Sequence, residues 1–504
     1  MAFKAKGQWI MAFDFGQNGG FTGGNGLTGS RYGGTDEFDV MQRVRLQLEA
    51  VASEALSGTV HFEMGNNIWG KSAGAGATNN NGGSPLGGDQ TNTIELKWAY
   101  LDWMIPQTDL KLRMGLQAMA LPSFVTNGDA SVFNDDVAGI VANYKFNDNV
   151  SLTALWARPF NDNYTTNYGG RTAYANYMDN VDAFALVLPL TFDGVKATPW
   201  ALYAAIGPNA FKDGTGEFGN LGISNVGTSY VLGGMVPVGG SRHKDGSNAT
   251  KRLSSYAEAW WAGLTGEVTV LDPFRIAWDF KYGSVRWDDS RLNRQGWLAS
   301  LLFEYKLDWA VPGLYAWYAS GDDSNPANGS ERMPSFDANG STNDLSSFAF
   351  NGNPYIPPRE NVLSRNMTGT WGIGARLKNV SFVEDLKHTL RLTYIGGTNS
   401  TTMAKYITGR KGPGWSTNPA IIAGPNAGLA GMDPLYMTTQ DHALEVGLTT
   451  RYQMYENFLV YMDASYIATW LDHSRSVWGL SQMNGRSDQQ RDPWNISLQF
   501  VYSF

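Results

Sequence analysis

The chain has 504 residues and a formal net charge of -8; 42% of its residues are hydrophobic, 17% are charged and 13% are aromatic. It contains no cysteine, which excludes disulfides and thiolate metal sites. No apolar run approaches the ~18 residues of a membrane-spanning helix, and the charges are too dispersed to indicate nucleic-acid binding.

The N-terminus does not resemble a secretory signal. No apolar segment follows the lysines of Met1 to Lys6, so an exported protein would be present here in its processed form, with the signal peptide removed. No linker or change of composition divides the chain. Residues 1–504 are therefore expected to form a single domain.

Strand-like alternation begins close to the N-terminus and continues to the end. In 110–117 the even-numbered residues are apolar, whereas Lys111, Arg113 and Gln117 lie between them. Side chains of an extended strand point alternately to opposite faces, so each such segment predicts a strand with one apolar and one polar face. The segments are 6–15, 43–50, 59–64, 93–100, 110–117, 138–146, 150–158, 181–190, 197–206, 255–268, 274–286, 296–306, 312–320, 369–378, 387–395, 441–454, 457–470 and 494–504.

The connections alternate between long and short. Those at 17–38, 70–91, 118–136, 207–254, 321–368 and 396–440 are long, most of the connections between them are short turns, and 379–386 is intermediate. An up-and-down barrel with one long-loop rim and one short-turn rim has this pattern, which is typical of outer-membrane barrels. The sequence therefore predicts an all-β, transmembrane, antiparallel barrel of about 18 strands, with 16 as the alternative, long extracellular loops and short periplasmic turns.

The last eleven residues show the alternation most clearly. Large apolar side chains occupy every second position from Trp494 to Phe504. Their number matches the roughly 9 to 11 residues that a tilted strand needs to cross a bilayer. The chain thus ends on a predicted transmembrane strand with an aromatic C-terminal residue.

These features together resemble a bacterial outer-membrane porin. The amino-acid sequences of 7–15 (GQWIMAFDF) and 42–48 (QRVRLQL) are similar to those of the homotrimeric porins of sulfate-reducing bacteria. The resemblance implies a homotrimer of water-filled barrels in the outer membrane, in contact with lipid and lipopolysaccharide, that passes small hydrophilic solutes. It also implies that the barrel assembly machinery recognises Phe504. The Pro-Glu-Phe-Gly-Gly motif of the enterobacterial constriction loop is absent, so the residues of that constriction do not carry over.

The third long connection, 118–136, corresponds to the loop that folds into the pore in porins. It carries Asp129, Asp135 and Asp136 as a candidate acidic side of a constriction. The candidate basic wall lies on the polar faces of three predicted strands and comprises Arg43, Arg45, Lys97, Lys111 and Arg113. An acidic loop that faces a basic wall would create an electric field across the pore, and this field would select ions by charge. In the alternative, the aspartates cap a turn and the basic residues pair with lumenal Glu49, Glu63 and Glu95.

Outward-facing aromatic residues are candidates for the girdles at the two membrane surfaces. They include Trp98, Tyr100, Trp278, Tyr282 and Tyr502. Some of them could instead make subunit or core contacts.

No cofactor is expected, with one open possibility. Asp322 and Asp323 offer closely spaced oxygen ligands suited to calcium, although the ligand spacing of an EF-hand is missing.

The sequence leaves three classes of function open. The first is a porin for passive diffusion, with a weak anion preference inferred from Arg43, Arg45 and Arg113. The second is an outer-membrane barrel enzyme, a lipase or protease, for which no catalytic site can be assembled; His61 and Glu63 form at most a lumenal pair. The third is a surface adhesin or binding barrel that uses its long loops.

Overall fold

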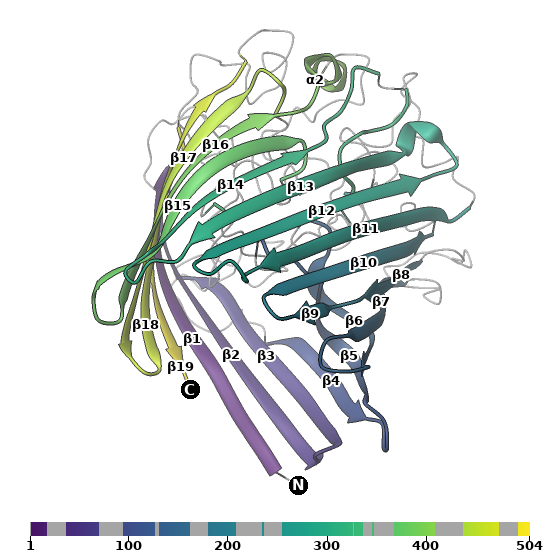
Figure 1. Ribbon diagram of the computed structural model, residues 1–504, viewed down its shortest axis with the longest axis vertical. Helices are drawn as coiled ribbons and strands as arrows, with labels where there is room; N and C mark the ends of the chain where they lie inside the picture. Colours follow the sequence, from purple (N-terminus) through teal and green to yellow (C-terminus); the bar gives the residue numbers. More distant parts are fainter. Residues whose placement is uncertain are drawn as a thin grey trace.

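A computed structural model of the protein describes residues 2–17, 37–69, 94–126, 131–161, 180–207, 234–235, 255–325, 327–335, 345–346, 367–408, 437–472 and 492–504. These residues form one antiparallel sheet of nineteen strands (Figure 1). The strands are β1 (Ala2–Gln17), β2 (Glu37–Ser53), β3 (Leu56–Ile68), β4 (Glu95–Met104), β5 (Leu110–Ala120), β6 (Asn134–Lys145), β7 (Ser151–Asn161), β8 (Asn180–Val187), β9 (Leu190–Phe192), β10 (Val195–Ile206), β11 (Ala257–Val268), β12 (Phe274–Arg286), β13 (Arg294–Tyr305), β14 (Val311–Ala319), β15 (Thr370–Val383), β16 (Leu386–Gly397), β17 (His442–Tyr455), β18 (Phe458–Trp470) and β19 (Trp494–Ser503).

The sheet closes on itself as an 18-stranded barrel. β8 and β9 are separated only by Leu188 and Pro189, and both pair with β10, so they occupy one position of the barrel. Proline has no N–H to donate to the ladder, which accounts for the interruption. β1 pairs with β2 on one side and with β19 on the other, which closes the ring.

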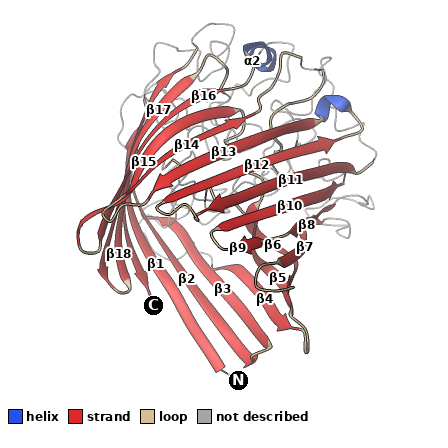
Figure 2. Cartoon of the chain, viewed as in Figure 1, coloured by secondary structure: helices blue, strands red, loops and turns tan. Residues whose placement is uncertain are grey.

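The predicted fold class is confirmed, and each predicted segment overlaps a strand of the structure. The connection at 379–386 is an exception to the predicted lengths. It is a turn of two residues, Glu384 and Asp385, because β15 and β16 extend into it from both sides. Helices are few among the described residues: a 3-10 turn (Ser290–Leu292) and α2 (Thr401–Thr408), both drawn in blue in Figure 2. None of the described helices could span a membrane.

The two faces of the strands differ in the expected way. On β13, Trp297, Leu301 and Phe303 are exposed on the outside, whereas Leu298 and Glu304 are buried on the inside. An apolar outer surface and an inner surface that includes charged groups are what a barrel in lipid requires, because hydrocarbon solvates no polar group.

The first and last strands meet at a tightly packed seam. The backbone amide of Gly7 donates to the carbonyl of Phe504 at 2.7 Å, and the amide of Phe504 donates back to the carbonyl of Gly7 at 3.0 Å. A Cβ on residue 7 would lie 2.3 Å from the Phe504 ring, so only glycine leaves room for the terminal ring. The seam therefore depends on both ends of the chain.

Candidate functional site

Charged side chains form a continuous network across the inner wall. Lys196 of β10 donates to Glu267 of β11 at 2.9 Å, and Arg275 of β12 donates to Glu267 at 2.8 Å. Arg275 also donates to Glu304 of β13 at 2.8 Å, and Glu304 accepts from Arg376 of β15 at 2.7 Å. We call these five residues the charged network. Three cations share two carboxylates, so the network has a formal charge of +1.

The connection between β5 and β6 folds into the barrel. We call its described residues, 121–126 and 131–133, the inner loop. The amide of Phe124 donates to Thr265 Oγ1 on β11 at 3.0 Å, and its carbonyl accepts from Arg275 at 2.8 Å. Ser123 Oγ donates to Asp279 Oδ2 on β12 at 2.9 Å. The loop therefore crosses from β5 to the wall formed by β11 and β12.

The inner loop is shorter than the predicted segment 118–136. β5 continues to Ala120 and β6 starts at Asn134, so Asp135 and Asp136 lie on a strand. The alternating pattern could not reveal this, because neither strand end has a regular apolar face. Asp129 lies outside the described residues.

A second connection also lies inside the barrel. Arg294 of β13 donates to the carbonyls of Arg332 and Met333, at 3.2 and 3.1 Å. Trp261 of β11 donates to the carbonyl of Pro334 at 2.8 Å. We call residues 331–335, from the connection between β14 and β15, the second inner segment. No sequence signal pointed to it.

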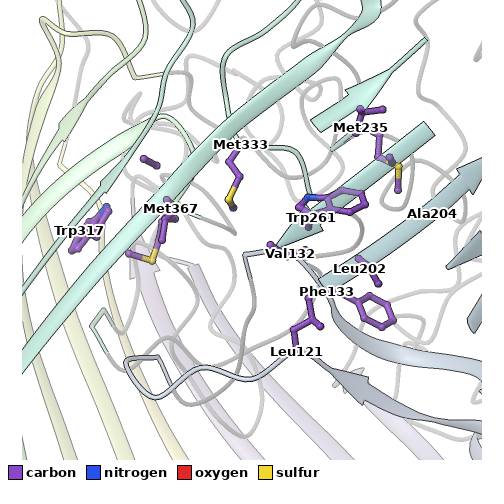
Figure 3. Packing of buried hydrophobic residues seen from close by; sticks show 14 of the residues in the cluster. Leu121, Val132, Phe133, Leu202, Ala204, Met235, Trp261, Trp317, Met333 and Met367 are labelled. Carbon is purple, nitrogen blue, oxygen red and sulfur yellow. The ribbon is translucent and has the colours of Figure 1, made fainter. Parts of the chain in front are cut away.

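Apolar side chains fill the space between these segments and the wall. Leu121, Val132 and Phe133 of the inner loop belong to one buried cluster with Trp261 and with Met333 of the second inner segment (Figure 3). The cluster is unusually rich in methionine, with Met119, Met235, Met333, Met367, Met403 and Met437. Methionine adapts to irregular gaps. The interior beside the two infolded segments is thus packed with apolar side chains, although the alternation predicted a mostly polar inner face.

The residues of the predicted basic wall lie on β2, β4 and β5, and Arg45, Lys97, Lys111 and Arg113 form ion pairs. Arg45 pairs with Glu63 at 2.6 Å, and Arg113 pairs with Asp102 through two hydrogen bonds of 2.8 Å. Lys111 reaches the same Asp102 at 3.4 Å. Arg43 is buried on the inner face of β2. The alternative in which basic residues pair with lumenal carboxylates therefore describes Arg45.

One aspartate of the predicted acidic loop contacts the basic wall directly. Asp136 forms an ion pair with Lys97 and also accepts a hydrogen bond from Trp98 Nε1 at 2.6 Å. These two charges touch, so they do not face each other across a gap. Asp135 accepts from the amide of Asp136 at 2.7 Å. Neither aspartate belongs to the inner loop.

Two of the predicted outward aromatics face inward. The ladder places Trp98 opposite His61 and Tyr100 opposite Thr59, and opposite residues share a face. His61 and Thr59 are buried on the inner wall. A β-bulge at Lys97 inserts one residue and reverses the alternation after Leu96. By their registers with Leu301, Trp297 and Phe458, the other three candidates, Trp278, Tyr282 and Tyr502, face outward.

A cavity of about 350 Å³ lies on the inner wall beside the inner loop. Lys111 and Arg113 line it together with apolar Leu155, Val187 and Pro122. The cavity therefore combines cationic and apolar lining groups in one place.

The calcium candidates lie in a loop rich in hydrogen bonds. Asp323 Oδ1 accepts from the amide of Asn325 at 2.6 Å, and Asn328 donates to both Asp323 and Glu331, at 3.0 and 2.9 Å. Burial, together with the charges of Asp323 and Asp322, raises the pKa of Glu331. No group of three or more potential metal ligands occurs in the described part of the chain.

The sequence matches no protein-family model and no curated protein. Solved structures do match. The outer membrane protein OprD from Pseudomonas aeruginosa has a TM-score of 0.51 and 12% identity, over 100% of this chain and 93% of OprD. OccK9 (OpdG) from the same organism has a TM-score of 0.52 and 11% identity, over 100% and 98%.

A third match comes from another genus. OccAB4 of Acinetobacter baumannii has a TM-score of 0.50 and 10% identity, over 100% of this chain and 98% of OccAB4. At these identities the likeness concerns the fold, which is a large closed antiparallel barrel of the kind found in these proteins. The finer resemblance to porins of sulfate-reducing bacteria stays a prediction.

Proposed function

We propose that the protein is an outer-membrane porin, a channel for passive diffusion of small hydrophilic solutes and ions. The observation that carries this proposal is the division between the two faces of the closed barrel. The outer face is apolar, and the inner face holds the charged network. Such a barrel spans lipid, and Lys196 and Arg275 of the network keep exposed side chains that a solute can meet.

The test is conductance in a planar bilayer with the detergent-purified, folded protein. We expect large, steady openings, because charged inner walls sustain a hydrated path. A protein that inserts in folded form without opening channels would refute the proposal. Hydrolysis of lipid or peptide would then be measured, since a barrel enzyme, a lipase or a protease, is the alternative. A surface adhesin or binding barrel would likewise conduct no ions.

We propose a weak preference for anions, and two groups of inner charges support it. Two cations, Lys111 and Arg113, share Asp102, and the charged network also has one cation in excess. Local charges act more strongly than the net charge of -8 because a narrow pore focuses the field. A salt gradient across the same bilayer gives the sign of the reversal potential. A cation-selective reversal potential would contradict the preference.

The proposals about the remaining partners are based on the resemblance to porins. We propose a homotrimer, embedded in outer-membrane lipid and lipopolysaccharide, whose channels would close in three equal steps. Calcium binding at Asp322 and Asp323 is a further proposal, which calorimetric titration with the metal tests.

Phe504 is proposed as the residue that the barrel assembly machinery recognises. Replacing Phe504 with alanine is expected to slow assembly in the presence of that machinery more than unassisted refolding in detergent, because only recognition depends on the machinery. Pulse-chase assembly, read as the fraction of folded barrel on unheated gels, measures both rates. Equal slowing in both reactions would instead assign Phe504 to packing on Gly7 alone.

A further inference from the structure

The inner loop is fastened to β12 by a buried ion pair. Asp279 and Lys281 lie two residues apart on the inner face of β12, with 2.9 Å between Lys281 Nζ and Asp279 Oδ2. Their side chains are 1% and 2% exposed. A charged pair this deeply buried is costly to desolvate, so its presence calls for a role besides stability.

Each member of the pair holds a different part of the inner loop. Asp279 accepts from Ser123 Oγ at 2.9 Å, and Lys281 donates to Ser131 Oγ at 2.8 Å. The two serines stand on opposite arms of the loop. The pair therefore anchors the loop where it leaves β5 and again where it returns to β6.

The second inner segment contacts the inner loop at Ser131, the residue that Lys281 holds. Ser335 Oγ donates to the carbonyl of Ser131 at 3.0 Å, so Lys281, Ser131 and Ser335 form a chain of contacts from the wall through both infolded connections. Displacement of Ser131 would thus disturb both.

We propose that Asp279 and Lys281 are positioning residues that hold the inner loop against β12 and thereby keep the width of the passage constant. This inference rests on the proposed channel function. Neither residue is exposed enough to line a path for solute, so the pair acts through the position of the loop. Without it, the loop exchanges between the wall and the rest of the interior.

The double variant Asp279→Leu with Lys281→Met isolates this effect, because neither new side chain can form a hydrogen bond with Ser123 or Ser131. It removes one positive and one negative charge, so the net charge of the interior is unchanged. We expect single-channel currents that flicker, with transient closures about tenfold to thirtyfold more frequent than in the parent. That range corresponds to the loss of two hydrogen bonds of ordinary strength. The reversal potential should keep its sign.

The matched control is Arg158→Met with Asp182→Asn. This bidentate pair joins β7 and β8, with contacts of 2.7 and 3.0 Å, and its removal is also neutral in net charge. Among the hydrogen bonds of the described residues, none joins Arg158 or Asp182 to the inner loop. We expect steady currents from the control.

A second variant tests the proposal from the loop. Ser123→Ala with Ser131→Ala removes the two hydroxyl partners and leaves the buried charges in the wall, so it keeps the test valid if the first variant does not fold. Folded variants of either kind with currents as steady as the parent would overturn the proposal. A parent protein that opens no channels would instead refute the porin function itself, so the two failures are distinguishable.

Discussion

Replacing Glu304 with glutamine is expected to lower the free energy of unfolding by about 3–5 kcal/mol. Glu304 is buried, and its two carboxylate oxygens accept from Arg275 and Arg376. Glutamine has nearly the same shape but no charge, so the buried guanidinium of Arg376 and the partly exposed one of Arg275 lose their common counter-ion, while Arg275 keeps Glu267. The measurement is urea unfolding of the refolded barrel in detergent, followed by tryptophan fluorescence.

The control for this variant is Asp148→Asn. Asp148 pairs with Lys145 at 2.7 Å, but its side chain is 94% exposed in a turn. Solvent screens that pair, so no measurable change of stability is expected. If Glu304→Gln unfolded at the same urea concentration as the control, the charged network would not stabilise the barrel.

Replacing Gly283 with valine is expected to destabilise the barrel by about 1–3 kcal/mol or more, the usual effect of overpacking a core. A Cβ on residue 283 would lie 2.4 Å from Trp261 Cδ1 and 2.8 Å from Pro334 Cγ. The indole cannot move aside freely, because it is 1% exposed and its Nε1 donates to Pro334. The same urea unfolding measures the effect, and limited proteolysis reports on the second inner segment.

Two further variants separate overpacking from a general intolerance of glycine replacement. Gly58→Ala should be nearly neutral, because its Cβ would meet only the end of the Leu101 side chain, at 3.2 Å. Adding Trp261→Ala to Gly283→Val removes the obstructing ring, so the two changes together should destabilise the barrel by less than the sum of their separate effects. A Gly283→Val barrel as stable as the parent would show that the wall adjusts at this position.

The strands could be predicted from the sequence because the signal is local. A strand in lipid must alternate, and the alternation is visible within ten residues, as in 494–504. The alternation gave the wrong face for Trp98 and Tyr100, because large apolar residues continue at every second position through the bulge at Lys97. A bulge moves the following residues to the opposite face of the strand, and the pattern of apolar and polar residues in the sequence does not show it.

The site was only partly predictable, because it depends on the register between strands. Arg45 and Glu63 were both assigned to the inner face, but their contact follows from the pairing of β2 with β3. The charged network extends over five strands between Lys196 and Arg376, and no single segment contains more than one of its members. The second inner segment has no periodic pattern, so only the structure could place it.

The seam between Gly7 and Phe504 has a consequence for the time course of folding. The contact that closes the ring joins Gly7 and Phe504, which are very far apart in the sequence. Such contacts form slowly, because a long chain must lose its freedom before they are made. Until β19 arrives, β1 and β18 each present an unpaired edge that could pair with another chain. A barrel that lacks only β19 therefore stays open to pairing with another chain until its own last strand docks.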